Sequence, residues 1–269
     1  MIETALEVDG LRVRCFEEGQ GPSVLLLHGG TLGFSGAMWL PNLAPIARHG
    51  FRVVAYDQPG FGHSDPPPNF TLSYREQFLR RIVNKLGLNR PVLVGHSQGG
   101  QLVVGAALSN PEEFSAVIVL GTGSLLPPTA ATKKEIDPVV AGSEPTMENV
   151  RTLLKANLHD HKLITEEFLS EYYSGCIGAN FTNAKSRVQA SGGNPSVPLW
   201  QKLSEIRLPC KFIYGRQDRG GPAERIQIAR QRYPYLDFEL FENCHHILQW
   251  DQPQLVEERI ASFARLVNS

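Results

Sequence analysis

The chain has 269 residues, 42% hydrophobic and 20% charged, which is typical of a globular protein long enough to bury a substantial core. Its 26 Lys and Arg residues nearly cancel its 27 Asp and Glu residues. This excludes the broad basic surface on which binding to nucleic acid or an anionic membrane depends, so the expected partner is a small-molecule substrate.

In chain order, the first predicted element is an antiparallel hairpin over residues 5–17, a polar stretch that suits a sheet edge. Short, continuous apolar runs then alternate with helical patterns, as expected for strands that helices cover on both faces. We therefore predict an α/β fold with a mostly parallel, twisted sheet. The predicted strands are 24–27, 53–56, 92–94, 117–120, 212–214 and 238–241, and the predicted helices include 78–86, 101–108 and 223–230.

The segment 92–100 reads VLVGHSQGG, an apolar strand that runs into GxSxG and is followed by an apolar helix. This pattern predicts a nucleophile elbow with Ser97 at its tip. Such a turn needs a strained backbone, and Gly95 and Gly99 allow neighbouring segments to approach without Cβ clashes.

The alternation of strands and helices stops after 117–120. Residues 121–201 instead contain Pro- and Thr-rich chain, then helical patterns at 147–158 and 165–173 and a return loop at 191–198. We predict an α/β core built from residues 1–120 and 202–269, with a helical cap, or lid, over 121–201.

A serine hydroxyl needs a base within hydrogen-bond reach and a third group that orients the base. Asp218 follows the strand 212–214, and His245 and His246 follow the last strand, where open α/β sheets place their sites. Adjacent side chains face different ways, and we assign His246 rather than His245. The predicted triad is Ser97, His246 and Asp218. Other histidines that compete on composition alone are His28, His63 and His96.

An oxyanion intermediate needs backbone N–H donors. The residue after the nucleophile, Gln98, is predicted to supply one, and Gly30, just past the strand 24–27, the other. Thr31 is the alternative to Gly30.

Asp57, His63 and Asp65 are expected to hold the loop after the strand 53–56. The acidic N-terminus lacks the features of a signal peptide, and no stretch reaches the roughly 18 apolar residues of a membrane span, so we expect a cytoplasmic protein. The four scattered cysteines predict reduced, mostly buried thiols. We expect no metal and no cofactor; the oligomeric state stays open, with a homodimer as one arrangement.

Five motifs in this order resemble those of the α/β-hydrolase fold superfamily over nearly the whole chain. They are LHGG at 27–30, DQPGFGHSD at 57–65, GHSQGG at 95–100, GRQD at 215–218 and HHILQWDQP at 245–253. The resemblance supports His246, because His246, Asp251 and Pro253 match the register of that family's final motif.

Within the superfamily, EPTMENV at 144–150 and LITEEFL at 163–169 resemble the cap of the meta-cleavage product hydrolases. That resemblance implies hydrolysis of a carbon–carbon bond beside a ketone, in a vinylogous 1,5-diketone that carries a carboxylate, during aromatic degradation. Three positions differ from the subgroup's pattern: Tyr172 replaces its cap arginine, Ile247 its tryptophan and His96 its asparagine. Arg187 or Lys185 is a candidate substitute for the arginine.

Without the resemblance, the triad predicts acyl-type hydrolysis, so a carboxylesterase or lactonase is the alternative. A ligand receptor that uses the same pocket is a further alternative. The predicted pocket residues are Phe34, Trp39, His96, Leu125, Tyr172, Phe181, Arg187, Trp200 and Ile247.

Overall fold

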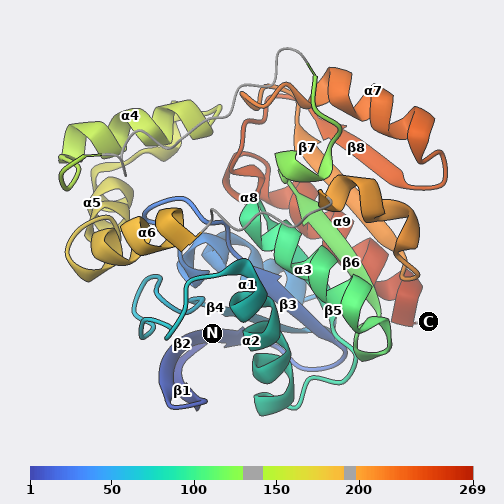
Figure 1. Ribbon diagram of the computed structural model, residues 1–269, viewed down its shortest axis with the longest axis horizontal. Coiled ribbons are helices and arrows are strands. Elements are labelled where there is room, and N and C mark those ends of the chain that lie inside the picture. Colours follow the sequence, from blue (N-terminus) through green and yellow to red (C-terminus); the bar gives the residue numbers. More distant parts are fainter. Residues whose placement is uncertain (130–141, 191–197, 269) are drawn as a thin grey trace.

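The computed structural model describes residues 1–129, 142–190 and 198–268, in which eight strands form one sheet (Figure 1). The strand order is β1-β2-β4-β3-β5-β6-β7-β8. The strands from β3 to β8 run parallel to their neighbours, and β2 is antiparallel to both β1 and β4. Their bounds are β1 Ile2–Val8, β2 Leu11–Glu18, β3 Ser23–Leu27, β4 Arg52–Tyr56, β5 Val92–His96, β6 Ala116–Leu120, β7 Cys210–Gly215 and β8 Asp237–Phe241.

All the predicted strands are present, and the hairpin at the sheet edge is confirmed. Its two-residue turn contains Asp9 and Gly10, both with positive φ, at 51° and 76°. This conformation matches the twist of a tight hairpin. The mostly parallel α/β sheet predicted from the continuous apolar runs is therefore confirmed.

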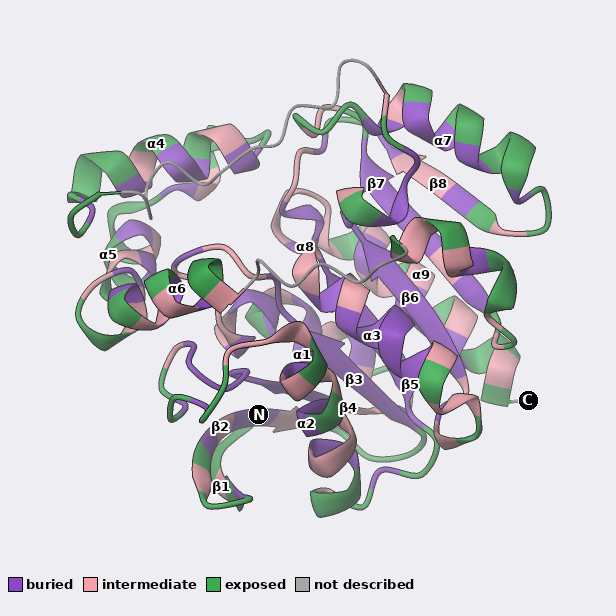
Figure 2. Ribbon diagram, in the orientation of Figure 1, coloured by how far each residue is buried: buried purple, intermediate pink, exposed green. Residues whose placement is uncertain are grey.

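Helices cover both faces of the sheet (Figures 1 and 2). On one face pack α2, Leu72–Lys85, α3, Gln98–Ser109, and α7, Pro222–Arg232. On the other pack α1, Leu40–Ala47, and α9, Pro253–Asn268, with the short α8, Leu248–Asp251, beside them. Each helix buries an apolar stripe; in α9 it is Val256, Ile260 and Ala264, spaced four residues apart.

The segment between β6 and β7 forms α4, Met147–Asn157, α5, Glu166–Ser174, and α6, Ala179–Ala190. Thr146 and Thr165 cap α4 and α5 at the N-terminus by accepting backbone N–H groups. These helices share a third core cluster with the loop after β3, through residues such as Leu154, Leu169 and Phe34. The predicted return loop 191–198 lies outside the described residues apart from Pro198.

Cys15, Cys176, Cys210 and Cys244 are all buried and free, as predicted. Among the described residues, no helix has the length and hydropathy to cross a membrane.

Candidate active site

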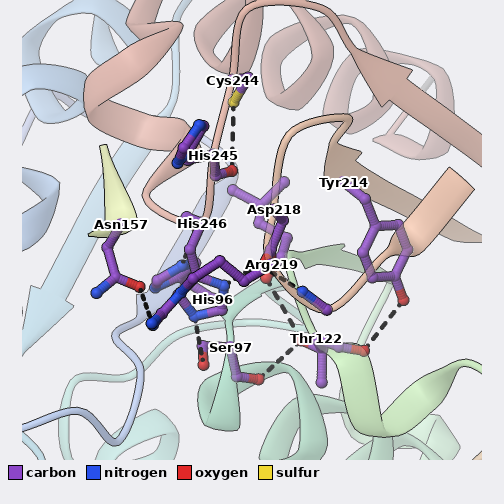
Figure 3. Close-up of polar contacts among 12 residues, drawn as sticks. His96, Ser97, Thr122, Asn157, Tyr214, Asp218, Arg219, Cys244, His245 and His246 are labelled. Atoms are coloured by element: carbon purple, nitrogen blue, oxygen red, sulfur yellow. Dashed lines mark hydrogen bonds and ion pairs between the residues drawn. The ribbon is translucent and has the colours of Figure 1, made fainter. Parts of the chain in front are cut away.

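Ser97 lies between β5 and α3 in a strained turn. Its φ of 52° and ψ of −122° are unusual for a residue with a side chain. The turn is fastened to the end of β6, because Ser97 N donates to Leu120 O at 2.8 Å and Thr122 Oγ1 donates to Ser97 O at 2.7 Å (Figure 3). The structure thus holds Ser97 in the elbow conformation that the sequence predicted.

Glycines make room for this turn. A Cβ at Gly95 would lie 2.4 Å from Gly99 O, and one at Gly99 would lie 2.7 Å from the carbonyl oxygens of Leu27 and His28. The backbone of α3 therefore approaches β5 and the end of β3 more closely than any other residue type would permit.

His246 connects Ser97 to Asp218 (Figure 3). Its Nε2 lies 3.0 Å from Ser97 Oγ, and its Nδ1 lies 2.8 Å from Asp218 Oδ2. Asp218 comes from the turn after β7 and His246 from the loop after β8. With Nδ1–H donating to the carboxylate, Nε2 is left to accept the serine proton.

The carboxyl group of Asp218 is ionised at neutral pH. Burial is the largest influence and raises its pKa, but the charge of His246, the hydrogen bond from His246 and that from Gly220 N together outweigh burial. They lower the pKa of Asp218 to about 2. The carboxylate therefore stabilises a protonated His246.

His245 does not face Ser97. Its backbone N–H donates to Asp251 Oδ2 at 2.8 Å, and its ring lies 5.5 Å from that of His159. Of the two adjacent histidines, the structure therefore brings His246 to Ser97.

His96 lies beside both Ser97 and His246. Its Nε2–H donates to His246 O at 2.8 Å, and its ring centre is 5.0 Å from that of His246. Burial, together with the nearby charge of His246, lowers the pKa of His96 to about 3, so its ring is neutral.

Asn157, at the C-terminal end of α4, also holds the histidine loop (Figure 3). Its backbone O accepts N–H groups from His246 and Ile247, both at 3.1 Å. Its side-chain Oδ1 lies 3.5 Å from Arg219 Nη2. The sequence analysis did not predict this role for Asn157, because an asparagine at the end of a helix does not indicate which distant loop its backbone will contact.

The two predicted oxyanion donors lie on facing segments. Gln98 N belongs to the first turn of α3, whose N–H groups have no partner within the helix. Gly30 is in contact with Gln98, since a Cβ at Gly30 would lie 2.3 Å from Gln98 Oε1. Both backbone segments therefore reach the neighbourhood of Ser97, and their role as donors stays a prediction.

A cavity of about 830 Å³ adjoins the triad. Thr31, Asn157, Asp218, Arg219 and His246 are among its lining residues. Its size suits a small molecule. Arg219 was not predicted, although its position directly after Asp218 could have suggested it.

None of the nine predicted pocket residues is among the described residues that line this cavity. Trp39 is fully buried in the core between the sheet, α1 and α9, and Leu125 in the core on the other face. Trp200 lies near the end of α7, where its carbonyl accepts the Tyr233 hydroxyl at 2.7 Å. The expectation that these three line the pocket is corrected: Trp39 and Leu125 are buried in the core, and Trp200 is half-buried at a distant position beside α7.

The other predicted pocket residues lie nearer to the site. Phe34 packs 5.4 Å from the His96 ring. Tyr172, Phe181 and Ile247 belong to the third core cluster, and the Tyr172 hydroxyl donates to Leu32 O at 2.8 Å. Tyr172 also lines a separate cavity of about 110 Å³.

Arg187 binds the loop after β4 rather than the cavity. Its Nη1 donates to Gly60 O at 2.7 Å, and its guanidinium lies 3.6 Å from the Phe61 ring centre. Arg187, a proposed substitute for the cap arginine, is therefore engaged with this loop and is not among the described residues that line the 830 Å³ cavity.

The loop after β4 is held as the sequence predicted. Asp57 accepts the N–H groups of Gly36 at 2.7 Å and His63 at 2.8 Å, and Asp65 accepts that of Arg12 at 2.7 Å. Among the described residues, no group of three or more His, Cys, Asp or Glu side chains is arranged to hold a metal ion.

Residues 22–253 match the family described as alpha/beta hydrolase fold. A 2-hydroxy-6-oxononadienedioate/2-hydroxy-6-oxononatrienedioate hydrolase of Paraburkholderia phymatum is 30% identical, covering 94% of this chain and 91% of its own. A meta-cleavage product hydrolase structure has a TM-score of 0.81 at 22% identity, covering 98% of each chain. An esterase from Exiguobacterium antarcticum has a TM-score of 0.82 at 18% identity, covering 98% of this chain and 100% of its own.

The chain therefore belongs to the alpha/beta hydrolase fold family, and it is a hydrolase. The resemblance to the α/β-hydrolase fold superfamily, and within it to the meta-cleavage product hydrolases, is confirmed.

Proposed function

We propose that this protein is a serine hydrolase that cleaves a carbon–carbon bond beside a ketone in a small molecule, using Ser97, His246 and Asp218 as a catalytic triad. The observation that carries the proposal is the hydrogen-bonded line from Ser97 Oγ through His246 to Asp218. It lies at the C-terminal ends of the strands, where open α/β sheets bind ligands.

In this mechanism Ser97 Oγ attacks the ketone carbon while His246 Nε2 takes the hydroxyl proton. The negative charge that forms on the ketone oxygen is stabilised by the N–H groups of Gln98 and Gly30. The carbon–carbon bond then breaks, the leaving carbon accepts a proton from His246, and water releases the acyl group from Ser97. A conjugated leaving group helps, because it spreads the charge of the departing carbon.

A carboxylate on the substrate fits the lining of the cavity. Arg219 is the one Arg or Lys among the described residues that line it, and Asn157 lies within reach of its guanidinium. We propose that Arg219 pairs with a substrate carboxylate, in place of the cap arginine that this chain lacks. In this proposal the helices α4–α6, within residues 121–201, act as the lid.

Carboxylester hydrolysis is the second candidate, and a specific observation favours it. The sequence resemblance aligns Tyr172 with the subgroup's cap arginine, and the Tyr172 hydroxyl donates to Leu32 O. A phenol cannot replace the charge of a guanidinium, and an ester without a carboxylate needs no such charge.

The experiment compares initial rates of purified wild type and Ser97→Ala on p-nitrophenyl acetate and on a coloured meta-cleavage diketone acid. Serine-dependent kcat/KM that is far higher for the diketone supports carbon–carbon hydrolysis. Efficient turnover of the ester alone supports the carboxylesterase. Failure on both, with ligand-dependent stabilisation, would point to a ligand receptor.

A further inference from the structure

We infer that Arg75 is a positioning residue that holds the two walls of the oxyanion hole, the Gln98 side and the His28–Gly30 side, in register. The inference rests on the proposed function, because the oxyanion hole matters only if Ser97 is the nucleophile. It starts from the placement of Arg75 in α2.

Arg75 occupies the apolar face of α2. Phe78, Leu79 and Ile82, which follow it by three, four and seven residues, are fully buried, and Arg75 itself is only 2% exposed. Burial of a guanidinium costs free energy unless it is well paired. In the described part of the chain Arg75 forms no ion pair with a carboxylate. Its buried charge is instead satisfied by hydrogen bonds to two glutamine side chains.

One end of the guanidinium fixes Gln98. Arg75 Nη1 donates to Gln98 Oε1 at 2.5 Å. The same amide lies against Gly30, where a Cβ would be 2.3 Å from Oε1 and 2.9 Å from Cδ. The Gln98 side chain is therefore confined between Arg75 and Gly30, which limits how the peptide N–H of Gln98 can turn.

The other end of the guanidinium fixes the loop after β3. Arg75 Nε and Nη2 donate to Gln58 Oε1 at 3.1 and 2.5 Å. Gln58 then donates twice to His28, from Nε2 to the backbone O at 2.6 Å and from N to the ring Nε2 at 3.0 Å. His28 immediately precedes Gly29 and Gly30, so this chain of hydrogen bonds ends at the second wall.

In the series of hydrogen bonds from Gln98 to His28, each donor is matched with an acceptor. Burial lowers the pKa of His28 to about 3, so its ring is neutral, with Nδ1–H donating to Gly29 O at 2.7 Å and Nε2 accepting from Gln58. Burial lowers the pKa of Arg75 to about 10, which leaves it charged at neutral pH. Its planar fork donates to the two amide oxygens from separate nitrogens in a fixed geometry, which the single nitrogen of a lysine ammonium cannot reproduce.

The test compares Arg75→Lys and Gln98→Met with wild type. The matched control is Arg80→Gln, which removes an arginine from the exposed side of the same helix, where it pairs with Glu113. We measure kcat and KM for p-nitrophenyl acetate, and the rate constant for phosphorylation of Ser97 by diethyl p-nitrophenyl phosphate. In that second reaction Ser97 Oγ bonds to phosphorus, p-nitrophenolate leaves, and the phosphoryl oxygen occupies the oxyanion hole.

We expect both variants to lose roughly 10- to 100-fold in kcat and in phosphorylation rate, with KM within about twofold of wild type. Because Gln98→Met leaves α2 and the Gln98 peptide group in place, it keeps the test valid if Arg75→Lys does not fold. The double variant should lose less than the product of the two single losses, because both remove the same hydrogen bond.

Rates within twofold of wild type for folded Arg75→Lys and Gln98→Met, with Ser97→Ala inactive, would overturn the inference and leave the proposed function intact. A change in KM alone would also overturn it, because it would indicate a role in substrate binding. A Ser97→Ala variant that keeps full activity would overturn the proposed function, and the inference with it.

Discussion

His96 Nε2–H donates to the backbone carbonyl of His246 at 2.8 Å. His96, which directly precedes the proposed nucleophile Ser97, thus holds the backbone of the proposed base. The N–H of His246 is held separately by Asn157 O at 3.1 Å. Both peptide groups of His246 are therefore anchored, one from β5 and one from α4. Burial lowers the pKa of His96 to about 3, so its ring is neutral at neutral pH. The tautomer that carries the proton on Nε2 makes the hydrogen bond to His246 O.

Replacing His96 by Ala should therefore reduce kcat. Without its donor the His246 loop can move, and a displacement of about 1 Å costs roughly a hundredfold in rate. His96→Asn, which keeps a shorter N–H donor, should lose less. Steady-state kinetics on p-nitrophenyl acetate checks both, with thermal melts to exclude global unfolding; an Ala variant as fast as wild type would contradict the assignment.

Ser97→Ala, His246→Ala and Asp218→Asn should each reduce kcat by about ten-thousand-fold while the protein stays folded. The matched control is His245→Ala, which removes the neighbouring ring without touching Ser97 and should keep kcat within about twofold. Loss of activity in His245→Ala with normal activity in His246→Ala would reverse the choice between them.

Arg219→Gln should discriminate between charged and neutral substrates. If Arg219 pairs with a carboxylate, KM for the diketone acid rises roughly 10- to 100-fold, the worth of a charge-assisted hydrogen bond. KM for a neutral ester should stay unchanged. Arg216→Gln, on the same turn but paired with Glu242, is the control. Equal effects on the acid and the ester would argue against carboxylate binding by Arg219.

Acid should destabilise the fold in two steps. Burial, as the main cause, lowers the pKa of His28 and of His96 from 6.5 to about 3, so the unfolded chain binds more protons and stability falls as pH drops from about 6.5 toward 3. The pKa of Asp218 is lowered from 3.8 to about 2, so its contribution is present above pH 3.8 and is lost toward pH 2. Urea unfolding between pH 2 and 8 measures this, and His96→Asn should flatten the upper step.

Gly99→Ala should destabilise the elbow. Its Cβ would lie 2.7 Å from two backbone oxygens, which cannot move without shifting β3, so we expect a loss of about 1–3 kcal/mol in the free energy of unfolding. Gly142→Ala is the control, because a Cβ there meets nothing within 4 Å. Equal free energies of unfolding of the two variants in urea would contradict this prediction, because they would show that the backbone around Gly99 can move to make room for a Cβ.

The sequence alone determined the sheet, the elbow and the three residues of the proposed triad. Apolar runs and turn residues act locally, and the parallel arrangement brings the C-terminal ends of β5, β7 and β8 to one edge, so Ser97, Asp218 and His246 had to converge.

Only the tertiary structure decided what surrounds those residues. Whether Trp39 or Trp200 lines the cavity depends on packing between helices far apart in sequence: Trp39 fills a core, and Trp200 lies half-buried near the end of α7. The bonds from Arg75 to Gln98 and from His246 to Asn157 join segments 23 and more residues apart. Each depends on the direction of a single side chain or peptide group, which no periodic pattern records.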